Sequence, residues 1–225
     1  MKILTASLLA ILLVLSGCAT RNVKTDITTN ELQTKKSALL VMSLSQPKES
    51  VQYGATTIYF LPKGTDSIAR SRLVTYDPDY VLPKPDSDFP NEFSLLKVIE
   101  VPEGEVQISG WAFAMYRSRY ESTDASPPFT IKVKAGDIVY LGNFSLTPHY
   151  GDGIFGVTTV RGATPLIKDQ SQRDLSLFKQ RYPQLPPAIH QQLPVGIWAL
   201  EPYQKLLKKL LELEKNNPSN PKAED

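Results

Sequence analysis

The sequence predicts a mainly β protein, an antiparallel β sandwich with peripheral C-terminal helices. Between residues 93 and 146, apolar and polar side chains alternate over short segments that are separated by turn residues, as in strands with one buried face. The 18 prolines cluster outside the apolar runs, which indicates stiff connections between strands. A helical spacing of apolar residues begins only after residue 169.

The first strands are expected at residues 38–44, an apolar run of strand length, and at residues 56–61, which are β-branched and aromatic. Pro62 ends the second of these strands because proline cannot donate a ladder hydrogen bond. Residues 75–90 carry four prolines among aspartates and predict an extended loop or an edge segment.

Residues 93–101 alternate along one face, and the Val-Pro-Glu-Gly sequence of residues 101–104 has the composition of a type I turn. Residues 105–116 then predict a central strand, because both of its faces look buried. One face carries large side chains and the other carries small ones: Trp111, Phe113 and Met115 against Gly110, Ala112 and Ala114.

Residues 129–133 alternate cleanly and predict a half-buried strand. A turn at Ala135 and Gly136 leads into a further strand over residues 137–146, and residues 154–160 are expected to form one more. Short strands at these intervals favour an antiparallel sandwich.

Two helices are expected after the strands. The first has candidate caps at Asp169 or Ser171 and ends before Pro183. Its buried face would carry Leu175, Phe178 and Tyr182.

The second helix begins near Pro202 and has lysines and Glu212 opposite a wide apolar stripe. This stripe either docks on the core or is a surface for a partner helix or a membrane. It consists of Tyr203, Leu206, Leu207, Leu210, Leu211 and Leu213.

The N-terminus has the pattern of a secretory signal peptide. Lys2 precedes an uncharged apolar run over residues 3–15, which is too short for a membrane span of about 20 residues. The small residues Ser16 and Gly17 follow, and then comes the one cysteine of the chain, Cys18.

The Leu-Ser-Gly-Cys order of residues 15–18 resembles the bacterial lipobox. The resemblance implies that the Cys18 sulfur receives a diacylglyceryl group, that the chain is cleaved between Gly17 and Cys18, and that the new amine is acylated. Several acyl chains anchor a protein stably, at ~0.8 kcal/mol per buried methylene. The alternative is a free cysteine, which would leave an unpaired reactive thiol in an exported protein.

Ala19 follows the cysteine, where Asp would mark an inner-membrane lipoprotein of a double-membrane bacterium. The expected location is therefore the outer membrane, with the globular part facing the periplasm. That compartment is oxidising, but without a second cysteine the fold must be stable without disulfides.

The chain is accordingly expected to divide into five parts. Residues 1–17 are the signal peptide and residues 18–36 are a lipidated N-terminus with a flexible polar tether. Residues 37–168 form the sandwich, residues 169–215 form a helical extension packed on it, and residues 216–225 are a polar disordered tail.

A second resemblance rests on the segments VPEGEVQISGW, FTIKVKAGDIVYLGNF and DLSLFKQRYPQL. They are similar to a group of bacterial lipoproteins of unknown function with a small prealbumin-like β sandwich. The likeness covers roughly residues 94–186, supports the fold and the envelope location, and implies no activity. The matching residues are Gly104, Gly136, Asp137, Tyr140 and Gly142.

No catalytic or cofactor motif stands out, and the expected protein is not an enzyme. His149 and His190 lie far apart in sequence without companions at ligand spacing, so neither a metal nor a cofactor is expected. A net charge of +2 argues against nucleic acid as a partner. In residues 149–153, His149 and Asp152 are candidates for ligand binding, although a glycine turn before the next strand explains this stretch better.

Two functions stay open. The first is a membrane-anchored structural or protein-interaction module, with another envelope protein as its partner. The second is a binding module for a small envelope ligand, a glycan or lipid fragment, at Trp111, Tyr116, His149 and Asp152. An exposed apolar helix stripe would favour the first, and a deep pocket lined by aromatic residues would favour the second.

Overall fold

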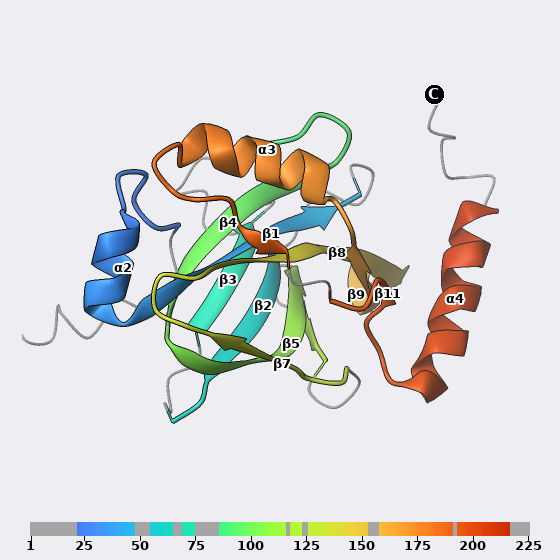
Figure 1. The fold of residues 1–225 in the computed structure, drawn as a ribbon. Helices are drawn as coiled ribbons and strands as arrows, with labels where there is room; N and C mark the ends of the chain where they lie inside the picture. Colours follow the sequence, from blue (N-terminus) through green and yellow to red (C-terminus); the bar gives the residue numbers. More distant parts are fainter. Residues whose placement is uncertain are drawn as a thin grey trace, which may run out of the picture.

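A computed structural model gives the fold, with strands in two sheets and helices at the periphery (Figure 1). The mainly β architecture expected from the sequence is confirmed. The residues that the structure describes are 22–47, 55–64, 69–74, 86–115, 118–122, 126–152, 158–190 and 193–216.

The first sheet of this part of the chain has six strands in the order β11-β9-β8-β1-β4, with β10 paired to β8. The expected strand at residues 154–160 lies partly outside the described residues, and β9 extends well beyond its predicted end. The strands are β1 (Ser37–Gln46), β4 (Phe93–Pro102), β8 (Ile138–Asp152), β9 (Thr158–Lys168), β10 (Ile189–His190) and β11 (Gly196–Ile197).

The second sheet has five described strands in the order β3-β2-β5-β6, with β7 also paired to β5. As predicted, β5 is central, with neighbours along both of its edges. The short strands β3 and β6 are not visible in the sequence pattern. The strands are β2 (Ala55–Pro62), β3 (Ala69–Val74), β5 (Gly104–Met115), β6 (Ser118–Glu121) and β7 (Phe129–Val133).

One central pairing differs from the antiparallel expectation. Strands β1 and β8 run parallel, from Leu39 beside Ile138 to Ser45 beside Ser145, and β10 is also parallel to β8. Between β1 and β8 the chain forms strands of both sheets, so no hairpin joins these two strands and forces them to be antiparallel. Alternation of side chains reports the buried face of a strand and not the direction of its neighbour.

The main core lies between the two sheets, and large side chains of β5 contribute to it. Trp111 and Phe113 are buried there as predicted, and Ala112 on the other face is buried too. The first sheet supplies Leu40, Met42, Leu44, Ile99, Val139, Leu141, Phe144 and Ile167, and the second supplies Ile58, Phe60, Val106, Ile108, Ile131 and Val133.

The other face of the first sheet is covered by helices α2 (Thr29–Lys35) and α3 (Ser171–Arg181) (Figure 1). Every residue of β1 is buried because this sheet is enclosed on both faces. The second apolar cluster consists of Ile27, Leu32, Leu39, Val41, Leu96, Val98, Ile138, Tyr140, Phe178, Tyr182 and Leu185.

The flexible tether expected over residues 18–36 is wrong for residues 22–36, which pack on the sheet. The Asn22 side chain bonds the backbone of β4, donating to the Leu96 carbonyl at 3.2 Å and accepting from the Val98 N–H at 3.1 Å. Thr28 and Glu31 form a capping box that starts α2, and Leu32 is fully buried. A polar segment with a good cap and one buried leucine forms a docked helix without the apolar period that sequence patterns detect.

Two glycines make the turns and bends that β8 requires. Gly136, in the connection from β7 to β8, has φ +88° and its N–H donates to the Ser37 carbonyl at 2.8 Å. Gly142 has φ +112° at the point where the register between β1 and β8 shifts. Both backbone conformations favour glycine, since an L side chain would be strained there.

The C-terminal region is helical only in part. In α3, Phe178 and Tyr182 are buried as predicted, but the N-cap is Gln170, without a side-chain bond, and is neither of the expected caps. Residues between α3 and α4 (Glu201–Lys215) form β10, β11 and a segment that enters the core at Trp198. The helical extension expected over residues 169–215 therefore contains its two helices, but the segment between them includes strands.

Candidate functional site

Several residues singled out in the sequence lie outside the described part of the chain. Gly17, Cys18 and Tyr116 are among them. Asp152 is described only as the last backbone position of β8. Trp111 and His149 are the candidates whose side chains the structure places.

Trp111 is a core residue rather than a surface platform. Its side chain is 2% exposed, and its indole N–H donates to the Ser126 Oγ at 3.1 Å. Its ring stacks against Tyr120, with centroids 5.7 Å apart, and Tyr120 covers it from the surface side. The burial of Trp111 explains its place in the sequence pattern and leaves it no free ring face for a ligand.

His149 lies in a strand and not beside a glycine turn. Strand β8 continues to Asp152 and pairs with β9, so the turn expected at residues 149–153 is wrong up to Asp152. The His149 Nε2 is 2.6 Å from the Thr164 Oγ1 on β9. The neighbouring Tyr150 is 40% exposed, and its partial burial raises the pKa of its hydroxyl to about 12.

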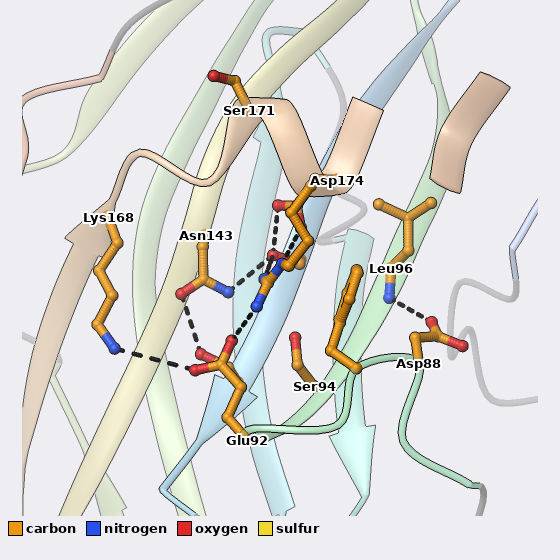
Figure 2. A network of polar contacts seen from close by, with 12 residues as sticks. Asp88, Glu92, Ser94, Leu96, Asn143, Lys168, Ser171 and Asp174 are labelled. Carbon is orange, nitrogen blue, oxygen red and sulfur yellow. Dashed lines mark hydrogen bonds and ion pairs between the residues drawn. The ribbon is translucent and has the colours of Figure 1, made fainter. Parts of the chain in front are cut away.

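The most concentrated polar chemistry of the described chain lies under α3, where Asp174 is fully buried (Figure 2). Its Oδ2 accepts from the Ser43 hydroxyl at 2.6 Å and from the Tyr140 hydroxyl at 2.7 Å. The Ser43 oxygen in turn accepts from the Asn143 amide at 2.7 Å. The carboxylate is thus hydrogen-bonded to β1 and β8, the two central strands of the sheet beneath it.

Arg173 completes this network on the side that opens to the surface. Its Nε donates to the Asp174 Oδ1 at 2.9 Å, and its NH1 donates to the Glu92 Oε1 at 2.6 Å. The guanidinium also lies over the Phe89 ring, 3.8 Å from the centroid. Burial lowers the Arg173 pKa, but the bonds to Glu92 and Asp174 outweigh that effect, so the pKa is raised and the cation is permanent.

The geometry of this network indicates a structural role, in which it holds α3 on the first sheet. Asp174, Tyr140, Ser43 and Asn143 have no exposed surface, so a substrate would have to displace α3 to reach them. Burial, followed by the charge of Asp174, raises the Tyr140 pKa, which keeps its hydroxyl protonated as a donor. A sequence signal for the network existed: Asp174 is four residues before Phe178, on the predicted buried face of α3.

The described residues offer little for a metal or a small apolar ligand. No group of three or more potential ligands from His, Cys, Asp and Glu comes together among them. One surface hollow of about 430 Å³ is lined mainly by polar and charged residues near α2, and another of about 340 Å³ adjoins Pro62 and Lys63. Neither contains Trp111 or His149.

Helix α4 is the most unusual surface feature. It stands beside the sandwich, at the opposite end from α2 (Figure 1). Three of its apolar residues are open to solvent: Leu206 and Leu213 are each 57% exposed and Tyr203 is 48% exposed. The other three leucines of the stripe are half-buried. Of the two alternatives that the sequence left open for this stripe, docking on the core is therefore wrong.

Removing α4 should therefore cost little stability. The free energy of unfolding of a chain that ends at Leu200 is expected to differ from that of the full protein by less than about 0.5 kcal/mol, because exposed groups away from the core contribute little. Urea denaturation followed by circular dichroism measures the difference. The matched control is a chain that ends at Pro194, which also lacks the buried Trp198 and should be strongly destabilised. Equal stability losses in the two truncations would contradict the conclusion that the segment with Trp198 belongs to the core and α4 does not.

No protein-family model matches the chain, and none of the curated proteins matches it either. Its class is therefore defined by its own structure: a β sandwich with one sheet covered by helices and with an uncovered amphipathic helix at one end. Among the described residues, no helix combines the length and the apolar content that crossing a bilayer requires.

Proposed function

We propose that the protein is a lipid-anchored lipoprotein of the bacterial outer membrane that faces the periplasm and acts as a non-catalytic interaction module. The observation that carries the interaction role is the uncovered apolar face of α4. Exposed apolar surface of this kind marks a contact site on a soluble domain more often than it marks catalysis. The anchor is supported by the Leu-Ser-Gly-Cys sequence of residues 15–18 and by Ala19 after it.

The packing of the N-terminal segment bears on how the anchor would work. The described chain begins at Asn22, and Val23 is already bonded to the Val98 carbonyl at 2.9 Å. A lipid on Cys18 would lie only a few residues earlier, so the sandwich would sit close to the bilayer surface with its α2 end nearest the anchor. The alternative role, binding of a glycan or lipid fragment, has no comparable support because Trp111 is buried.

The Cys18→Ser variant tests the anchor. It should abolish diacylglyceryl transfer, and with it the cleavage after Gly17, because the acceptor sulfur is missing. Intact-mass measurement should find a cleaved, acylated chain for the wild type, which partitions into detergent, and no acylated chain for the variant. Thr20→Ala, just beyond the cleavage site, should behave as the wild type. An unmodified Cys18 thiol on the mature wild-type chain would refute the anchor and the membrane location.

A further inference from the structure

The apolar face of α4 is wider than the contact of a single partner helix. At 3.6 residues per turn, Tyr203 and Leu210 lie near one line. Leu207 and Leu211 lie to one side of it, and Leu206 and Leu213 lie to the other. Together they span an arc of roughly 160°. A two-stranded coiled coil buries a narrower seam, made by two positions of each heptad. The width favours a broad apolar environment over a second helix.

Most charges of α4 lie off the apolar arc, as contact with a bilayer surface requires. Lys208 and Lys209 lie at opposite borders of the apolar face, while Glu201, Glu212 and Lys205 lie on the side away from it. Border lysines can extend their stems along the apolar face and place their ammonium groups among anionic headgroups. Glutamates on the opposite side stay in water. The exception is Glu214 in the last turn, which falls within the apolar arc at the end of the helix, while Lys215 falls outside the arc.

The apolar surface also continues beyond the helix itself. Leu200, directly before α4, is 40% exposed and falls on the same side of the helix as Leu207 and Leu211. Val195, in the segment that leads to α4, is 57% exposed. The uncovered apolar surface therefore includes the approach to α4.

We propose that α4 lies in the surface of a bilayer that contains anionic lipid, with its leucines in the acyl boundary and Glu201 and Glu212 in water. This inference rests on the proposed lipid anchor, which brings α4 within reach of the membrane. The anchor would lie near α2 and the helix lies at the opposite end of the sandwich (Figure 1). Two attachments at opposite ends hold the sandwich lengthwise on the bilayer, whereas one lipid alone leaves it free to rotate.

A site-specific label on the mature, lipidated protein tests this arrangement. The chain has one cysteine, which the anchor converts to a thioether, so Leu206→Cys would introduce the sole free thiol. That thiol is labelled with a polarity-sensitive fluorophore, and the protein is reconstituted into vesicles of phosphatidylcholine and phosphatidylglycerol. Nitroxide-bearing lipids report contact with the bilayer. Glu212→Cys, on the opposite side of α4, is the matched control.

The label at residue 206 should shift its emission to the blue and be quenched by nitroxide lipids at least about threefold more than the label at residue 212, because only the leucine side enters the acyl boundary. Both variants alter exposed positions, and circular dichroism should show an unchanged fold. Adding Leu213→Glu to the Leu206→Cys protein should remove the blue shift and the quenching.

The other outcomes separate the two proposals. Equal exposure of both labels to water in an acylated protein overturns the helix placement and leaves the anchor intact. Shielding at residue 206 that grows with protein density and does not respond to nitroxide lipids also overturns it, in favour of contact between two copies of this chain. A Cys18 without lipid, found by mass measurement, overturns the proposed function and removes the premise of this inference.

Discussion

Asp174→Ala should lower the free energy of unfolding by about 3–5 kcal/mol, because it leaves buried partners of a charged group without their acceptor. The hydroxyls of Ser43 and Tyr140 both donate to this carboxylate and have no exposed surface that water could reach. Arg173 would lose one of its two carboxylate partners and keep its bonds to Glu92 and to the Ser43 oxygen. The variant therefore leaves hydrogen-bond donors of β1, β8 and α3 without their acceptor at the same time.

Urea denaturation monitored by circular dichroism measures this loss. Gln172→Ala is the matched control, since Gln172 is an exposed residue of the same helix and should change stability by less than about 0.5 kcal/mol. Tyr140→Phe removes a single donor to the carboxylate and should fall between the two, at about 1.5–3 kcal/mol. If Asp174→Ala lowers the free energy of unfolding by less than about 1 kcal/mol, the network does not hold α3 on the sheet.

Trp198→Ala is the second large effect, with an expected loss of about 3–5 kcal/mol. Trp198 is 3% exposed and packs its ring against Phe129 and Phe144, with centroids 5.4 and 5.8 Å away. Its indole N–H donates to the Pro127 carbonyl at 2.7 Å. The substitution therefore opens a cavity between the two sheets and leaves the partly buried Pro127 carbonyl without its donor.

A comparison with Trp198→Phe separates packing from hydrogen bonding. Phenylalanine keeps much of the aromatic contact and loses only the indole donor, so its loss should be clearly smaller than that of alanine. Thermal unfolding of the two variants and the wild type gives the comparison. If both variants melt like the wild type, the segment between β11 and α4 is not part of the core, contrary to the burial of Trp198.

Much of the sandwich could be predicted from local patterns. The alternation in residues 129–133 identified β7 and its buried side, because a strand that buries one face must repeat every two residues. The two-faced pattern around Trp111 identified β5 as a central strand. The buried face of α3 could be predicted from the spacing of Phe178 and Tyr182. Asp174 lies on the same face, but an apolar pattern does not include a charged residue.

The candidate site was predicted less well, for a physical reason. Trp111 has the same apolar character on a surface platform as in a core, and only the packing of Ser126 and Tyr120 around it decides between the two. The glycines beside His149 were interpreted as a turn, but β9 supplies ladder partners that keep this stretch extended as far as Asp152. Both the burial of Trp111 and the extended conformation around His149 therefore depend on residues that are distant in the sequence.

The linear sequence alone was sufficient to predict the sandwich class and the buried face of α3, because each depends on the order and spacing of nearby residues. The lipid anchor at Cys18 stays a prediction from the same kind of local pattern. The tertiary structure decided which strands are neighbours, that residues 22–36 are docked and that Trp198 belongs to the core. It also decided that Tyr203, Leu206 and Leu213 of α4 remain exposed. An amphipathic period has the same form whether its apolar face meets a sheet, a membrane or water, and only the placement of the rest of the chain distinguishes these environments.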